Sequence, residues 1–298
     1  MIAAMTASLT PPSTPVAERR IPTRRISLAE TLRDLPHTYA GEDEVLMSHI
    51  LAAFSAVIPD GEEYFVRTVR HFRGEITDPQ LKLDVAGFIG QEAVHGREHR
   101  ELNDSLQALG YPTKKIEKAV DKALRFRERV MSPHANLACT AALEHFTATF
   151  GAVVLGNDEA RASLGPVGDF WAWHAMEECE HKAVAFDVFR ATGGTERTRK
   201  RMMNFITVTF IGGISFEVLI QMLRDPAART PGARKRTREQ LRNSPFLSKQ
   251  MWRNLRDYNR DGFHPDDHET DHLVEEWRET FFGEDGQLNE FLAATGAA

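Results

Sequence analysis

Helical periodicity runs through this chain from about residue 40 onward, and it constrains the fold more than any other feature. Apolar residues recur at positions 45, 46, 50, 51, 54 and 57, which is the spacing of one face of an α-helix. Strand-like alternation never exceeds four residues, and no segment repeats at a fixed period. Amphipathic helices without strands predict an all-α bundle.

Turn and capping residues divide this periodic region. Asp78-Pro79 and Ser132-Pro133 each supply a capping side chain followed by a proline that fits the first helical position. Pro59-Asp60-Gly61 is expected to interrupt the first helix. The expected helical segments are 44–57, 62–72, 78–109, 113–131, 132–155, 165–191 and 202–223, followed by a more polar helical region over 235–277.

The predicted organisation is one helical domain between two tails. Residues 1–27 are rich in Pro, Thr, Ser and Arg, which is typical of a disordered tail. The domain covers 28–285, with a core bundle over 40–191 and further C-terminal helices over 195–285 packed against it, and 286–298 form a second tail. Arg19-Arg20 and Arg24-Arg25 form a small basic patch at the end of the first tail, which is expected to be solvated, with contact to an anionic surface as the alternative.

Composition excludes several classes of protein. The chain has 37 Lys plus Arg against 43 Asp plus Glu, a net charge of −6, which argues against a dedicated nucleic-acid binder. Its two cysteines cannot form a disulfide framework or a zinc site with four cysteines. This cysteine usage fits a reducing cytoplasm, and no N-terminal run has the pattern of a secretory signal.

The segment 202–223 is apolar enough to resemble a membrane span. Asn204, Glu217 and Gln221 lie inside it, and such residues are costly in a bilayer. We therefore expect a helix buried against the rest of the domain. A helix that contacts lipid peripherally is the second interpretation, and a true span is the third.

Four of the expected helices carry carboxylates, and two of them add imidazoles at helical spacing. Glu92 and His95 lie three residues apart, as do Glu178 and His181, so each pair shares one helix face. His174 precedes Glu178 by one turn. Glu144 is a single acid in an apolar stretch, and Glu62 lies in the first helical region.

One Glu from each of two helices and Glu-x-x-His from two others form the ligand set of carboxylate-bridged di-iron and di-manganese bundles. Carboxylates offset the charge of two cations, and imidazoles complete the coordination. We therefore predict two iron ions, with manganese as an alternative. Zinc fits less well, because the helical His95 and His99 lack the acid directly after the first histidine that zinc proteases have. The predicted metal ligands are Glu62, Glu92, His95, Glu144, His174, Glu178 and His181.

Two of these choices have a competing neighbour. Glu63 competes with Glu62, and Glu177 competes with Glu178. Glu178 is preferred because it completes Glu-x-x-His with His181, which leaves Glu177 as an acid behind the ligands.

The strings IPDGEEYF, GFIGQEAVHGREH, AALEHFTA, WHAMEECEHKAVAFDVF and YNRDGFHPDDHETDHL resemble a bacterial family of predicted metal-dependent hydrolases in the ferritin-like superfamily. The resemblance covers about residues 28–280. It implies a ferritin-like bundle and metal ligation at Glu62, Glu92, His95, Glu144, Glu178 and His181. The motif His174-x-x-x-Glu178-x-x-His181 is also similar to that of the di-iron arylamine N-oxygenases, which implies oxygen activation.

Three functions follow from these features. The first is a di-iron oxidoreductase that activates O2 on a small, apolar or lipid-like substrate and takes electrons from a donor. The second is a metal-dependent hydrolase, in which Glu177 or His99 serves as the catalytic base for a metal-activated water. The third is non-enzymatic metal storage or sensing. The sequence is compatible with a homodimer and with peripheral contact to a membrane.

Overall fold

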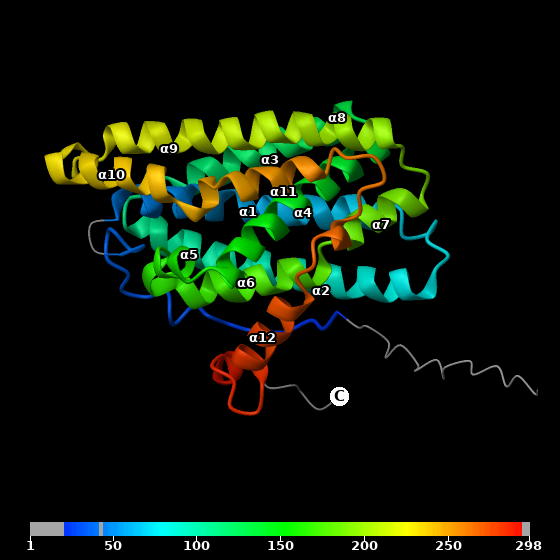
Figure 1. The fold of residues 1–298 in the computed structure, drawn as a ribbon, viewed down its shortest axis with the longest axis horizontal. Coiled ribbons are helices and arrows are strands. Elements are labelled where there is room, and N and C mark those ends of the chain that lie inside the picture. Colours follow the sequence, from blue (N-terminus) through cyan, green and yellow to red (C-terminus); the bar gives the residue numbers. More distant parts are fainter. Residues whose placement is uncertain (1–20, 42–43, 294–298) are drawn as a thin grey trace, which may run out of the picture.

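Four helices form the centre of the fold and carry all seven predicted ligands: α1 (Val45–His71), α2 (Pro79–Ala108), α4 (Pro133–Gly156) and α6 (Gly168–His181). The computed structural model describes residues 21–41 and 44–293. Within these residues the only β feature is an isolated bridge between Ile26 and Leu292. The prediction of an all-α bundle is confirmed (Figure 1).

The remaining helices surround this centre. α3 (Thr113–Val130) packs on α1, and α12 (Asp271–Phe282) packs on α6. The other helical elements are α5 (Asp158–Ala162), η1 (Gly165–Val167), α7 (Val184–Ala191), α8 (Glu196–Ile206), η2 (Thr207–Ile211), α9 (Gly212–Arg224), η3 (Ala227–Arg229), α10 (Pro231–Asn243), η4 (Pro245–Leu247), α11 (Lys249–Asp257), η5 (Pro265–Asp267) and η6 (Asn289–Phe291).

The predicted capping residues are confirmed. The Asp78 side chain accepts hydrogen bonds from the backbone N–H groups of Gln80 and Leu81, and the Ser132 side chain accepts one from Ala135. These bonds satisfy donors that a helix start leaves without partners. They fix where α2 and α4 begin.

The predicted break at Pro59 is wrong, because α1 runs through it without interruption. A proline inside a helix leaves the carbonyl four residues earlier without its donor, here the carbonyl of Ser55. The side-chain amide of Asn103 in α2 donates to that carbonyl across 3.2 Å. A neighbouring helix thus replaces the lost bond, and Glu62 remains on the same continuous helix as Ser55.

Residues 1–20 of the predicted disordered tail lie outside the described residues, whereas residues 21–27, which composition assigns to the same tail, belong to the fold. Ile21 and Ile26 are buried, and this segment lies across α2 at Gly87 and Gly90. A Cβ on Gly87 would lie 2.4 Å from the Ile21 carbonyl oxygen, so only glycine admits such a close approach. We refer to residues 21–27 as the N-terminal strap. At the other end Leu288 is also buried, so the predicted tail from 286 is partly packed as well.

The helical stretch from Glu196 to Arg224 joins α8, η2 and α9 and lies along one edge of the molecule (Figure 1). Only 17% of its most apolar 18-residue window is buried, so the prediction of a buried helix is wrong. One side packs on α1 and α4, and the opposite side exposes large apolar residues. The second apolar helix of sufficient length for a span, Pro133–Gly156, is 78% buried over its window and forms part of the core.

Candidate metal centre

Seven acidic and imidazole side chains from four helices meet inside the bundle. They form two adjacent sets whose ligand atoms lie within 4.8 Å of one another: Glu62, His95, His174 and Glu178 in the first, and Glu92, Glu144 and His181 in the second. These are the seven residues that the sequence proposes as ligands. Each of them is buried.

Glu178 and Glu92 lie between the two sets. Glu178 Oε1 is 3.2 Å from His174 Nε2, 3.6 Å from His95 Nδ1 and 3.7 Å from His181 Nε2. Glu92 Oε1 is 3.1 Å from His181 Nε2 and 3.9 Å from His95 Nδ1. These two carboxylates are therefore the ones that approach imidazoles of both sets.

The ligand atoms are largely without hydrogen bonds. Both carboxylate oxygens of Glu62, Glu92 and Glu144 are buried and lack a hydrogen-bond partner. The same is true of His95 Nδ1 and His181 Nε2. Burying charged oxygens without partners is costly, and a folded protein compensates with a cation or with protons. Four carboxylates can offset the charge of two divalent ions, and the imidazole nitrogens can complete their coordination. The residues present therefore fit a dinuclear metal centre.

Burial sets the protonation of this centre when no metal is bound. It raises the pKa of Glu144 to about 7, with a further contribution from the charge of Glu178. Burial and the neighbouring Glu144 also raise the pKa of Glu92 well above its usual value. Burial alone would lower the pKa of His181, but the nearby carboxylates of Glu144, Glu178 and Glu92 hold this pKa well above normal. In the absence of a cation, these raised pKa values favour the protonated forms of Glu92, Glu144 and His181.

Two polar side chains behind the ligands orient His95 and His181. His95 Nε2 donates to Glu177 Oε2 across 2.9 Å, which leaves Nδ1 as the nitrogen facing the first set. His181 Nδ1 donates to Gln91 Oε1 across 2.8 Å, which turns Nε2 toward the second set. Carboxylate or amide partners of this kind fix the tautomer of a metal-binding histidine.

Arg24 of the N-terminal strap joins these two supports. Its guanidinium donates to Glu177 Oε1 across 2.8 Å and to Glu180 across 2.7 and 2.8 Å. Glu180 in turn accepts from Gln91 Nε2 across 2.7 Å. The hydrogen bonds that orient both histidines therefore lead back to Arg24. Its side chain is only 9% exposed, so the prediction that it is solvated is wrong.

A longer chain of hydrogen bonds sets the tautomer of His174. Asn103 Nδ2 donates to Glu117 Oε1 across 2.8 Å, so its amide oxygen is the acceptor for the Ser55 hydroxyl at 2.7 Å. Since the Ser55 proton is used there, Ser55 Oγ accepts from His99 Nδ1 at 2.8 Å. His99 Nε2 then accepts from His174 Nδ1 at 3.2 Å. His174 Nε2 is left without a proton and lies 3.2 Å from Glu178 Oε1.

The structure shows which member of each competing pair lies in the centre. Glu62 points into the first set, whereas the Glu63 side chain is 56% exposed and pairs with Arg100. Glu178 belongs to the first set, whereas Glu177 lies behind His95. Glu177 uses both oxygens and His99 uses both ring nitrogens in the bonds above, which places them as supports of ligands. Their proposed role as a catalytic base stays a prediction.

Sequence reasoning missed Arg24, Gln91, Ser55, Asn103, Glu117 and Glu180 as supporting residues. Gln91 has the clearest local signal, since it is a polar residue directly before a ligand on a helix that must be buried there. Arg24 has none, because its partners Glu177 and Glu180 lie 153 and 156 residues further along the chain.

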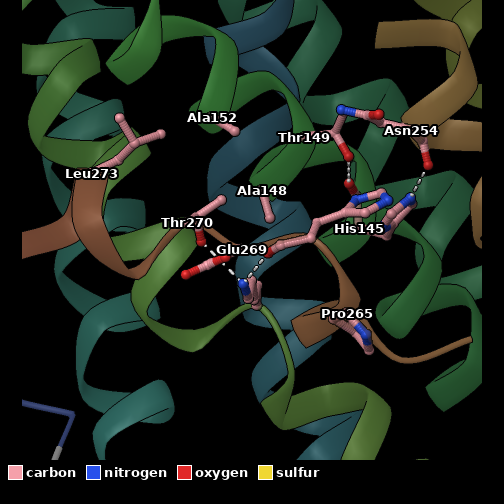
Figure 2. A pocket seen from close by; sticks show the side chains of 11 residues that line it. His145, Ala148, Thr149, Ala152, Asn254, Pro265, Glu269, Thr270 and Leu273 are labelled. Atoms are coloured by element: carbon pink, nitrogen blue, oxygen red, sulfur yellow. Dashed lines mark hydrogen bonds between the residues drawn. The ribbon is translucent and has the colours of Figure 1, made fainter. Parts of the chain in front are cut away.

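A pocket with a cavity volume of about 240 Å³ lies beside α4 but outside this centre (Figure 2). Among its lining residues are His145 and Lys182, which directly follow the proposed ligands Glu144 and His181 in the sequence. His145 Nε2 donates to the Asn254 carbonyl at 3.0 Å, and Lys182 Nζ donates to the His268 carbonyl at 2.6 Å. This pocket is therefore built from the outward side of the ligand helices.

Comparison with protein families gives one match, to a family described as predicted metal-dependent hydrolase, over residues 23–269. The chain belongs to this family. Comparisons with functionally described proteins and with solved structures gave no match. Membership confirms the resemblance seen in the sequence motifs, and the matched range contains all seven side chains of the candidate centre. The family's description agrees with buried Glu and His groups able to bind metal ions.

Proposed function

We propose that this member of the family is a dinuclear iron oxidoreductase that uses O2 to oxidise a small apolar substrate, with manganese as the alternative metal. One observation carries the proposal: three imidazole nitrogens and four carboxylates face a single buried space from four helices. A ferritin-like arrangement is the bundle type that this ligand distribution fits.

The surroundings of the centre favour oxidation over hydrolysis. Trp173 contacts His95 with ring centroids 5.0 Å apart, and Trp171 and Phe170 contact His99 at 5.0 and 4.8 Å. Aromatic walls exclude water and protect a reactive oxidant, and O2 is small and apolar enough to enter such a site. Hydrolysis requires water and a base beside it, and both groups proposed as that base are engaged in supporting bonds.

The protein's own residues have separable tasks in this proposal. Glu62, His95, His174 and Glu178 would hold one ion, and Glu92, Glu144 and His181 the other, with Glu92 and Glu178 between them. Two such ions would supply electrons for the reduction of O2, and an external electron donor would return the oxidised ions to the reduced state after each turnover. Glu177, Gln91 and His99 hold the imidazoles in the tautomer that binds metal. His174 adds a neutral donor and so raises the ligand number without adding negative charge.

The test begins with metal content and continues with oxygen. Protein from iron-supplemented cells should contain about two iron ions per chain. After anaerobic reduction, stopped-flow mixing with O2 should produce a transient visible absorption. His174→Ala should keep much of the iron but change the lifetime of that absorption. One zinc per chain, or a reduced protein indifferent to O2, would contradict the proposal.

Metal-dependent hydrolysis is the second candidate because the family carries that description. It predicts that a metal-loaded sample cleaves ester or amide substrates and that the reduced protein does not consume O2. Storage or sensing, the third function, predicts metal uptake without turnover of any substrate. The same metal-loaded preparation distinguishes all three.

A further inference from the structure

The helix formed by α8, η2 and α9 presents an apolar outer face to solvent. Val208, Phe216, Leu219 and Leu223 are 73, 64, 55 and 60% exposed. Together with Gly212 they follow one another at intervals of three or four residues, so they form one stripe along the helix. We call these five residues the outer face of α9. At Gly212 an added Cβ would meet no atom within 4 Å, so the stripe is open there.

The opposite side of this helix is anchored, so the outer face cannot turn inward. Val218 packs with Leu46 and Ala53 of α1 in a small apolar cluster. Gln221 Oε1 accepts a hydrogen bond from His49 Nδ1 across 3.0 Å. An exposed apolar stripe held in a fixed orientation marks an interaction surface.

Basic residues gather at the C-terminal end of this face. Between residues 224 and 242 the chain has seven basic residues and only two acidic ones, Asp225 and Glu239, although the whole chain has a net charge of −6. Asp225 is occupied by His49, whose Nε2 lies 2.9 Å from Asp225 Oδ2. The seven basic residues are Arg224, Arg229, Arg234, Lys235, Arg236, Arg238 and Arg242.

We propose that the outer face of α9 and the adjacent basic region bind the surface of a bilayer containing anionic phospholipids. An apolar stripe beside a dense positive charge is the pattern of helices that lie in the membrane interface. Clusters of four to eight Lys or Arg next to such a helix bind anionic lipid headgroups. The surface would therefore hold the protein on the membrane without any helix crossing it.

A spanning helix and a second copy of the chain fit these observations less well. Spanning would require the contacts with α1 and α4 to break and would place Asn204, Glu217 and Gln221 in hydrocarbon. Pairing with a second copy along the stripe would bring the exposed basic ends, Arg201 and Arg224, near those of the other copy in either orientation. Like charges there would oppose association, whereas an anionic surface attracts both ends.

The experiment measures co-sedimentation of the full chain with sucrose-loaded vesicles. One set contains phosphatidylcholine alone, and the other contains phosphatidylcholine and phosphatidylglycerol at about 7:3. We expect at least about tenfold stronger partitioning onto the anionic vesicles, and a loss of this preference at high salt because exposed charges are then screened. If the protein binds neither kind of vesicle, the proposal is overturned.

Variants assign the binding to this surface. The double substitution Phe216→Glu and Leu219→Glu should lower partitioning at least about tenfold, and the triple substitution Arg234→Glu, Lys235→Glu and Arg238→Glu should abolish the preference for anionic lipid. The matched controls are Lys82→Glu and Leu83→Glu, since Lys82 is exposed and Leu83 is 43% exposed. They lie on α2, on the other side of the bundle from α9 (Figure 1), and should leave binding unchanged.

Two further measurements keep the result unambiguous. Helix content by circular dichroism and bound metal should be the same in all variants, because each changed side chain is exposed. If light scattering shows a dimer that the Phe216→Glu and Leu219→Glu variant dissociates, the surface binds a second copy and the lipid proposal fails. Loss of binding in the α2 controls would equally overturn it. None of these outcomes depends on the reaction proposed for the metal centre.

Discussion

His99 Nε2 accepts a hydrogen bond from His174 Nδ1 across 3.2 Å, so the tautomer of one imidazole determines the tautomer of the other. The tautomer of His99 is fixed by its hydrogen bond to Ser55, and the orientation of the Ser55 hydroxyl is fixed by its hydrogen bond to Asn103. The proton position on a proposed metal ligand is thus set by a residue on another helix that cannot reach the metal.

Ser55→Ala should weaken metal binding in the first set without removing a ligand. The substitution deletes the acceptor for His99 Nδ1–H, which frees His99 to take the other tautomer and to compete for the His174 proton. Loss of such outer support typically costs 10- to 100-fold in metal affinity, and we expect about tenfold. Competitive titration with a chelator measures it. Thr68→Ala is the matched control, because Thr68 lies on the same helix and bonds to Thr140; an equal loss there would contradict the tautomer argument.

Glu178→Ala should remove most of the metal, whereas Glu177→Gln should keep both ions at reduced affinity. Glu178 lies within reach of all three imidazoles of the centre, while Glu177 contacts only His95 among them. Elemental analysis of the two purified variants checks this. If Glu177→Gln loses metal and Glu178→Ala retains it, the assignment of ligand and support on α6 is reversed.

Removal of metal should make stability fall as pH rises above 6.5. A carboxyl whose pKa is raised by folding, as for Glu144 at about 7, stabilises the fold while protonated and loses that contribution as pH rises from 4.5 through about 7. His181, whose pKa is raised, changes in the same direction. Burial lowers the pKa of His95 to about 4, so His95 makes stability rise with pH instead. That rise ends near pH 6.5, the pKa of an unfolded histidine, so it does not affect the trend at higher pH.

The metal-loaded protein should show the reverse trend, because a cation displaces these protons and binds more tightly as pH rises. Thermal unfolding of chelator-treated and iron- or manganese-loaded samples between pH 6.5 and 8 measures the difference in Tm. The difference in Tm between the metal-loaded and the metal-free samples should increase with pH. A gap that narrows over this range would show that the buried acids do not bind the ion.

Arg24→Ala should destabilise the fold by about 3–5 kcal/mol, since it leaves the buried Glu177 with one partner fewer and removes the link to Glu180. Arg278 still pairs with Glu180 at 2.8 Å, so the lower part of this range is expected. Urea unfolding of metal-free protein gives the value. Arg25→Ala is the control, because that neighbouring side chain is exposed, and it should change stability by less than about 0.5 kcal/mol.

The sequence predicts the local part of the centre well because helix geometry is local. Glu92 and His95 share a face of α2 whatever surrounds them, and the same holds for Glu178 and His181 on α6. It does not predict the continuity of α1 through Pro59, because the compensating donor is the Asn103 amide on another helix. Nor does apolar composition reveal that Phe216 faces solvent, since a helix of this kind is equally suited to a core, a membrane surface or a partner.

The contact between Arg24 and Glu177 joins residues 153 positions apart, and this separation bears on the order in which the molecule assembles. During synthesis the strap leaves the ribosome long before its partners on α6, which follow only after α1, α2 and α4 have been made. Long-range contacts of this kind form late, because the loop that they close costs the most chain entropy. We therefore expect the strap to dock late in folding, and until then Glu177, which orients His95, lacks its contact with Arg24.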